Sequence, residues 1–265
     1  MRYSKKDICS AYTKLGVTHG KTVLLKSDIR PLGLYTPAEK ETVVQAHISV
    51  LCDLIDLSEG TLVVNAGSPS LCNTNTPYDP AHTPCEMGVL SEQVRTLPGA
   101  VRTQHPFYSY AAVGKNADFF CGPGARGVFG LNTPKQRLID ANALFVSVGL
   151  HPRLTSAVVH QVELMMGVPY RYTKEFLHPI VTETGIENQP FYLHVLRREC
   201  SIQRDLNAKI FAYYEQEHAL ASATLGMGNV YSLSMGTYYA TTQKAFLDDL
   251  FVWLKEEPQK KSYRI

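Results

Sequence analysis

Thr22-Val23-Leu24-Leu25 is an apolar run that predicts a buried β-strand, and the run ends at the polar residues Lys26-Ser27-Asp28. A second strand of the same character is predicted at Thr61-Leu62-Val63-Val64-Asn65. Between the two strands, residues 39–57 carry apolar side chains at helical spacing. Two buried strands joined by a long helix are typical of a parallel βαβ unit, in which ligands bind where strands end in loops. The sequence therefore predicts an α/β fold with a ligand site beyond the ends of these strands.

The elements around this unit fit the same fold class. A helix is predicted at residues 5–15 and a central strand at 143–149. Thr83-Pro84-Cys85-Glu86 combines an N-cap residue, a proline and a capping-box glutamate, which predicts a helix from there to about Arg95. The residues before it, 66–84, are long for a loop, which indicates a functional or mobile segment. Three more helices are expected, and we place them from Thr155 or Ser156 to Met166, at 204–223 and at 241–254, with a strand-like stretch between the last two.

The composition excludes several classes of protein. A chain of 265 residues with 45% apolar residues suits one large domain, taken here as 1–265. The net charge is +2 and no dense basic run precedes the tail at Lys260 and Lys261, so a nucleic-acid partner is not expected. No apolar stretch has membrane-spanning or signal-peptide character, so we expect a cytoplasmic protein with no membrane partner. The six cysteines form no CxxC pair, which indicates reduced thiols and no metal site.

Two histidines are candidates for a general base, because imidazole alone has an unperturbed pKa near neutrality. His105 precedes Pro106 and a run of small residues, which can fix the ring. His160 and Glu163 are three residues apart in a predicted helix and so share one face. Neither feature by itself shows a catalytic role. His105 could be a packed histidine with satisfied hydrogen bonds, and His160 with Glu163 could be part of an exposed polar helix face.

Short motifs follow one another in a definite order along most of the chain. They are Leu15-Gly16-Val17, Lys26-Ser27-Asp28, Leu32-Gly33, Gly60-Thr61-Leu62-Val63, Tyr78-Asp79-Pro80, Thr83-Pro84, Met87-Gly88, Glu92 with Arg95, Arg102 with His105-Pro106, Ser109, Ala111-Ala112, Gly114, Phe129-Gly130, Thr133-Pro134 with Leu138, His160 with Glu163, and Val168-Pro169-Tyr170-Arg171. In this order and spacing they resemble the aminoglycoside 3-N-acetyltransferases, a family of acetyl-CoA-dependent antibiotic N-acetyltransferases. No GxxxxGK, HExxH or GxSxG motif points elsewhere.

The resemblance implies a three-layer α/β/α sandwich around a mixed, largely parallel sheet, with a C-terminal helical and small β elaboration. It implies acetyl-CoA as co-substrate, with no metal, and an amine as the acceptor. His105 would remove the proton of the attacking amine, and Glu163 would orient its ring. The residues that fall in coenzyme-binding positions are Lys26, Ser27, Asp28, Thr83, Met87, Gly88, Arg102 and Ser109, and those expected to bind the acceptor are Asp79, His160 and Arg171.

The chain also departs from the family pattern. Lys26 and Asp28 replace a histidine and the second of two serines, which leaves open a protein that binds coenzyme or sugar without catalysis. Cys85 replaces a serine and would lie at a helix N-terminus, where a thiolate is favoured. A thiol acyltransferase or amidase built on Cys85, His105 and Glu163 therefore remains an alternative.

The charges near the motifs bear on the acceptor. Aminoglycosides are polycations, and between residues 66 and 114 the only acids are Asp79, Glu86 and Glu92. Basic residues are frequent further on, at Arg171, Lys174, Arg197, Arg198 and Arg204. Because arginine can grip phosphate bidentately, we expect a nucleotide-linked or other biosynthetic amino sugar ahead of an aminoglycoside, the alternative being a resistance enzyme. Surface charges with no specific role would give the same pattern. A homodimer is left open.

Overall fold

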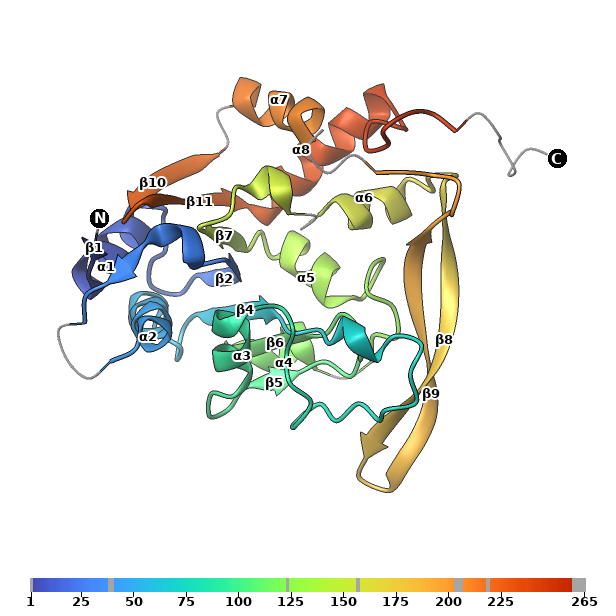
Figure 1. The fold of residues 1–265 in the computed structure, drawn as a ribbon, viewed down its shortest axis with the longest axis horizontal. Helices are drawn as coiled ribbons and strands as arrows, with labels where there is room; N and C mark the ends of the chain where they lie inside the picture. Colours follow the sequence, from blue (N-terminus) through green and yellow to red (C-terminus); the bar gives the residue numbers. More distant parts are fainter. Residues whose placement is uncertain are drawn as a thin grey trace.

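The computed structural model describes residues 2–37, 41–122, 124–155, 158–202, 207–217 and 220–258. Its centre is a seven-stranded sheet (Figure 1). In spatial order the strands are β10 (Ala221–Leu225), β11 (Gly228–Ser234), β7 (Leu144–Val148), β2 (Thr22–Ser27), β4 (Thr61–Asn65), β6 (Tyr110–Gly114) and β5 (Val101–Arg102). The two strands predicted first, β2 and β4, are parallel neighbours in the middle of this sheet, so the βαβ unit is confirmed.

The sheet is mixed, but less parallel than expected. Only β2 pairs in parallel, with β4 on one side and β7 on the other. The outer pairings, β4 with β6, β5 with β6, β7 with β11 and β10 with β11, are all antiparallel. The expectation of a largely parallel sheet is therefore wrong outside its centre. For β10 and β11 the reason is local, because the short turn at Gly226 and Met227 can join only antiparallel strands.

Helices cover both faces of the sheet, which confirms the three-layer arrangement. Alternate residues of one strand serve opposite faces: Val23 and Leu25 belong to one apolar cluster, and Leu24 belongs to the other. The first cluster packs under α1 (Lys5–Lys14), α2 (Val43–Ile55) and α3 (Val89–Arg95). The second packs under α4 (Ala117–Cys121), α5 (Pro134–Asp140), α6 (Val159–Met165), α7 (Asn207–Glu217) and α8 (Met235–Asp248). No helix in the described part of the chain is long and apolar enough to span a membrane.

Several helix boundaries differ from the predictions. The helix expected to start at Thr83 begins at Val89, after Gly88, whose φ of 113° suits glycine. The later helices are α7, which ends before the predicted residue 223, and α8, which begins at Met235 because Ser234 caps it. The predicted cap at Ser156 and the predicted helix start at Arg204 lie outside the described residues, as does the tail at 260–261.

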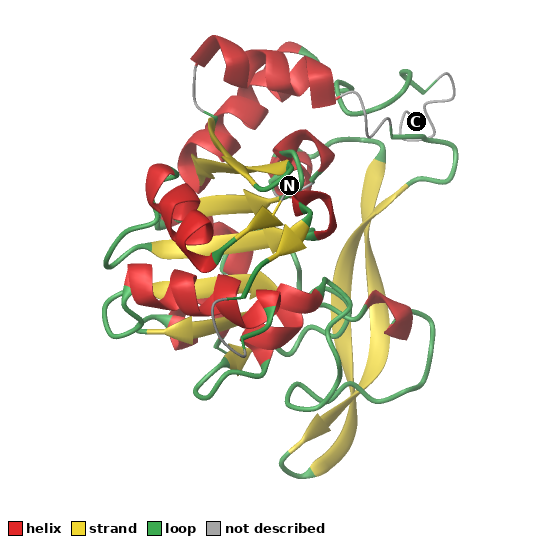
Figure 2. Cartoon of the chain, turned by 60° about the vertical axis from the view of Figure 1, so that its left-hand side comes forward, coloured by secondary structure: helices red, strands yellow, loops and turns green. Residues whose placement is uncertain are grey.

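One large element has no counterpart in the sequence-based prediction. β8 (Arg171–Thr182) and β9 (Gly185–Leu196) form a long antiparallel hairpin that stands at one side of the main sheet (Figure 2). A third apolar cluster holds this hairpin, where Ile180 and Phe191 pack with Tyr78 and Phe107. The remaining strands, β1 (Arg2–Tyr3) and β3 (Leu34–Tyr35), form a small parallel pair near the N-terminus.

Candidate active site

A cavity of about 370 Å³ lies where β2 and β4 end, beside the base of the hairpin. Its wall combines the ends of β2 and β4, the first residue of β6, residues of nearby loops, one residue each of α5 and α6, and five residues of the hairpin. These residues are Lys26, Asn65, Met87, Tyr108, Tyr110, Val128, Phe129, Lys135, His160, Arg171, Leu193, His194, Val195 and Leu196. The cavity is at the location that the βαβ unit predicts for a ligand site.

The chemical centre of this wall is a histidine–glutamate pair on α6. The spacing of three residues places His160 and Glu163 on one helix face, and His160 Nδ1 lies 2.6 Å from Glu163 Oε2. Phe129 and Trp253 contact the histidine ring edge-on and limit its rotation. Because Nδ1 faces a carboxylate, it carries the proton, and Nε2 is the nitrogen left to accept one. A ring oriented in this way is suited to act as a general base toward the cavity.

Glu163 is fully buried and is kept ionised by its neighbours. Arg171 Nε is 2.6 Å from Oε2, and the Tyr170 hydroxyl donates to Oε1 at 3.0 Å. Burial acts to raise the pKa of Glu163, but the hydrogen bond from His160 and the charge of Arg171 outweigh it, so the pKa is lowered. A buried carboxylate that is satisfied in this way can hold the histidine and stabilise its protonated form.

His105 does not pair with Glu163, contrary to the prediction. Its Nδ1 accepts the Tyr108 backbone N–H at 3.3 Å, and its Nε2 is buried without a well-aligned hydrogen-bond partner among the described residues. Phe107 and Phe191 enclose the ring. Burial lowers the pKa of His105 to about 4, opposed only in part by nearby backbone groups. His105 borders a much smaller space behind Tyr108 and Tyr110, so it lies in the wall's interior rather than on the 370 Å³ cavity.

Cys85 is also different from the expected nucleophile. It precedes α3 by several residues, and its sulfur accepts the Met87 backbone N–H and lies 3.7 Å from the Asn65 carbonyl oxygen. Burial raises the pKa of the thiol, which disfavours the thiolate. Cys85 is not among the residues lining the cavity and has no contact with His105 or Glu163.

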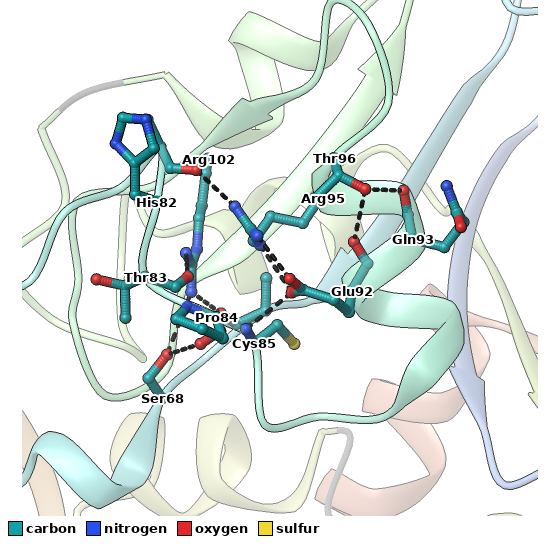
Figure 3. Close-up of polar contacts among 12 residues, drawn as sticks. Ser68, His82, Thr83, Pro84, Cys85, Glu92, Gln93, Arg95, Thr96 and Arg102 are labelled. Carbon is teal, nitrogen blue, oxygen red and sulfur yellow. Dashed lines mark hydrogen bonds and ion pairs between the residues drawn. The ribbon is translucent and has the colours of Figure 1, made fainter.

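Arg102 and Ser109 hold a loop together instead of reaching the cavity. Arg102 donates to the carbonyl oxygens of Thr83 and Ala66 and, at 3.1 Å, to the Ser109 hydroxyl, which itself donates to Ala66 at 2.6 Å. Figure 3 shows this guanidinium crossing the 66–88 segment beside Thr83 and Ser68. These bonds satisfy donors that would otherwise be free for a coenzyme phosphate, so neither residue is placed as expected.

The same loop uses Thr83 and Asp79 for its own turn. The Thr83 hydroxyl accepts the Asp79 N–H at 2.8 Å, and the Asp79 carboxylate accepts the Ala81 N–H and contacts His82. The capping-box prediction fails because Glu86 reaches back to Ser70, while Glu92 accepts the Cys85 N–H at 2.8 Å and pairs with Arg95 (Figure 3). Asp79 therefore does not face the cavity, and its expected contact with the acceptor is not formed by this arrangement.

Of the other residues predicted to bind the coenzyme, some line the cavity and others do not. Lys26 and Met87 line the cavity. Gly88 passes close to β2, since a Cβ built on it would lie 3.6 Å from the Ser27 carbonyl oxygen. Asp28 is turned away toward Arg30, with bonds of 2.6 and 2.8 Å.

Most cavity residues escaped the sequence-based reasoning, and three of them are polar side chains that bear on the chemistry of the site. His194, Lys135 and Tyr110 line the wall, yet only the motif Thr133-Pro134 before Lys135 gave any local signal, by starting a helix there. Arg171 was predicted to bind the acceptor, and it does line the cavity, but its charge is committed to Glu163. In the described residues, no group of three or more metal-ligating side chains comes together.

Comparison with known proteins identifies close relatives in sequence and fold. The family model described as aminoglycoside 3-N-acetyltransferase matches residues 24–246. The aminoglycoside N(3)-acetyltransferase VII of Streptomyces paromomycinus is 27% identical over 190 residues, which is 64% of this chain and 64% of the relative. The aminoglycoside N(3)-acetyltransferase IV of Salmonella sp is 29% identical over 63% of this chain and 61% of the relative. The matches thus span less than two thirds of these two relatives.

Solved structures agree over nearly the whole chain. The apoenzyme of aminoglycoside acetyltransferase AAC(3)-IVa superposes with a TM-score of 0.78 at 19% identity, covering 99% of this chain and 95% of that structure. The AAC-IIIb structure described as binary with CoASH gives a TM-score of 0.75 at 18% identity, covering 97% and 100%. At these identities the likeness shows the fold.

Proposed function

Because the chain belongs to the aminoglycoside 3-N-acetyltransferase family, we propose that it transfers the acetyl group of acetyl-CoA to an amine of an amino sugar. The observation that carries the proposal is the His160–Glu163 pair on the wall of the cavity. A related protein has been solved with CoASH, which supports acetyl-CoA as the co-substrate. Lys26 and Met87, together with the close approach of Gly88 to β2, mark the side from which the coenzyme would reach the cavity.

The proposed base is His160, which takes the role expected for His105. The acceptor amine attacks the thioester carbonyl, and His160 Nε2 removes its proton directly or through one water. Glu163 stabilises the imidazolium that results, since Oε2 is 2.6 Å from Nδ1. Collapse of the tetrahedral intermediate breaks the C–S bond, and the proton held by His160 returns to the departing thiolate of CoA.

This mechanism is a direct transfer and needs no covalent enzyme intermediate. Cys85 has a raised pKa and lies outside the cavity wall, so the thiol alternative has little support. A binding protein without catalysis is also less well supported, because the pair on α6 is complete with its arginine and tyrosine partners.

For the acceptor, the comparisons favour the aminoglycoside alternative over the nucleotide-linked amino sugar expected from the sequence. Both relatives are named for acetylation of aminoglycosides, and Arg171 is paired rather than free for phosphate. The test is a thiol-release assay with acetyl-CoA across sisomicin, gentamicin, glucosamine and phosphorylated or nucleotide-linked amino sugars. Release that depends on an amine acceptor and on His160 supports the proposal, and no release with any amine contradicts it.

A further inference from the structure

Lys135 is the most unusual charged residue on the cavity wall. It is the second residue of α5, only 2% exposed, and its side chain lines the same cavity as His160. Within the described structure it makes no hydrogen bond or ion pair, and its nearest favourable contact is the Tyr110 ring, whose centroid is 5.4 Å from Nζ. A buried ammonium without a counter-charge is costly, and one aromatic face compensates only part of that cost.

The rest of the wall does not supply the missing negative charge. The described lining residues include Lys26, Arg171 and Lys135 and no aspartate or glutamate. Glu163, a buried carboxylate of the site, is already bonded to His160, Arg171 and Tyr170. His194 adds a second unsatisfied group, since both of its ring nitrogens are buried without a hydrogen-bond partner.

We infer that Lys135 forms a subsite for an anionic group, a phosphate or a carboxylate, carried by the acceptor next to its reacting amine. The inference rests on the proposed function, because it takes the cavity to be the site where an amine is acetylated. It narrows the proposed amino-sugar acceptors to those that also carry an anionic group near the reacting amine, and an aminoglycoside without such a group would leave this subsite empty. An ammonium and a phosphate oxygen form a charge-assisted hydrogen bond, which is strong in a cavity from which water is excluded.

Burial also accounts for how the protein tolerates Lys135 without a ligand. Desolvation lowers the pKa of this amine to about 7, so a substantial fraction is neutral in the free protein near neutral pH. An anion bound beside it would restore the charged form. The subsite is therefore adapted to be charged when it is occupied.

The test is calorimetric binding of glucosamine 6-phosphate and of glucosamine to the full chain without acetyl-CoA. Wild type should bind the phosphorylated sugar more tightly, and Lys135→Met should weaken that binding about 10- to 100-fold, the loss expected for a hydrogen bond to a charged group. Binding of glucosamine should be unchanged. Lys135→Arg should keep most of the preference, and Lys21→Met, at an exposed position outside the cavity, should keep all of it.

Other outcomes would overturn the assignment. One such outcome is equal binding of the two sugars by wild type, and another is a Lys135→Met variant that keeps the preference for the phosphorylated sugar. Either result would show that Lys135 does not bind an anionic group of the acceptor. A weaker affinity for CoA in Lys135→Met would mean that the lysine serves the coenzyme's phosphates instead. Rapid acetylation of sisomicin with no preference for the phosphorylated sugar would refute the subsite and leave the acetyltransferase proposal intact. Binding of the sugar phosphate that depends on Lys135, without acetyl transfer to any amine, would support the subsite and refute the acetyltransferase proposal.

Discussion

Proton transfer at this site depends on which nitrogen of which histidine is available. His160 has its Nδ1 bound to Glu163 and lines the cavity, whereas His105 is enclosed by Phe107 and Phe191 and has a pKa of about 4. A neutral, enclosed imidazole contributes to packing. The two residues therefore have separate roles, and substitution should separate their effects.

His160→Ala should lower kcat by roughly 10²- to 10⁴-fold, the usual contribution of a general base, with the Kd of acetyl-CoA little changed. His105→Ala should instead lower the melting temperature, because it leaves a cavity among buried aromatic rings. Steady-state kinetics and thermal unfolding of the two variants make the comparison. Normal turnover in His160→Ala, together with inactivity in a folded His105→Ala, would assign the base to His105.

Cys85→Ser should retain most of the wild-type kcat. The thiol is held between the Met87 N–H and the Asn65 carbonyl, and a hydroxyl can make both contacts. The measurement is thiol release together with mass spectrometry of the protein after mixing with acetyl-CoA alone. An acetyl group found on Cys85, with activity lost in the serine variant, would favour the covalent mechanism.

At the scale of elements, the hairpin supplies five residues of the cavity wall, and the 66–88 segment brings Met87 to it. Arg102 holds the segment through carbonyl oxygens far apart in the chain, and it also stacks on Tyr78, with Cζ 5.0 Å from the ring centroid. Because lysine lacks the planar fork of donors, it cannot replace these contacts. Order in this segment is thus predicted to depend on one guanidinium.

Arg102→Lys should lower the free energy of unfolding by at least about 2 kcal/mol, since several hydrogen bonds to a charged group are lost. Amide hydrogen exchange should rise in residues 66–88, and KM for acetyl-CoA should increase more than kcat falls. Arg30→Lys, on an exposed pair with Asp28, is the matched control and should change stability little. Unchanged exchange in residues 66–88 of Arg102→Lys would show that the segment is held by other contacts.

The sequence predicted those elements whose signals are local. They are β2, β4 and β7, which are apolar runs. Helix α5 was not predicted, although Thr133-Pro134 is a local start signal and the threonine side chain accepts the Gln136 N–H. The hairpin was missed because Pro179 and Pro190 interrupt both strands, and proline is tolerated there because both are edge strands of a two-stranded sheet. The predicted cap at Thr83 was wrong because the Thr83 hydroxyl accepts the Asp79 N–H within its own turn and the Glu86 carboxylate accepts the Ser70 N–H.

For the candidate site, too, the sequence predicted only what local spacing determines. Spacing alone placed His160 and Glu163 on one helix face. It could not show that Tyr170 and Arg171 would bond the Glu163 carboxylate, or that the His105 ring would be enclosed, because those contacts depend on how the chain turns after α6 and on how side chains pack, which helix periodicity does not specify. Lys135 became notable only once its burial and its lack of partners were known.

For the whole molecule, buried neutral histidines couple folding to pH. Burial lowers the pKa values of His47 and His105 from 6.5 to about 4. Between these values the unfolded chain binds protons that the folded protein does not, so stability is full above about pH 6.5 and falls as the pH drops toward 4. The expected slope is about 1.4 kcal/mol per pH unit for each histidine.

Chemical denaturation at several pH values measures this slope. His47→Gln keeps a polar group beside Tyr12 but cannot titrate, so its stability should fall less steeply than that of wild type between pH 6.5 and 4. A His47→Gln slope equal to that of wild type would mean that His47 does not contribute.

The β8/β9 hairpin has a consequence for how the protein could diversify. Arg171, its first residue, is tied to the proton-transfer pair, whereas Leu193, His194 and Val195 face the cavity without contacting Glu163. The hairpin's share of the cavity wall is therefore largely a separate stretch of chain from the pair proposed to activate the acceptor. Selection could change the side chains of Leu193, His194 and Val195, and with them the acceptor, while Arg171 keeps its bond to the His194 backbone oxygen and its pairing with Glu163.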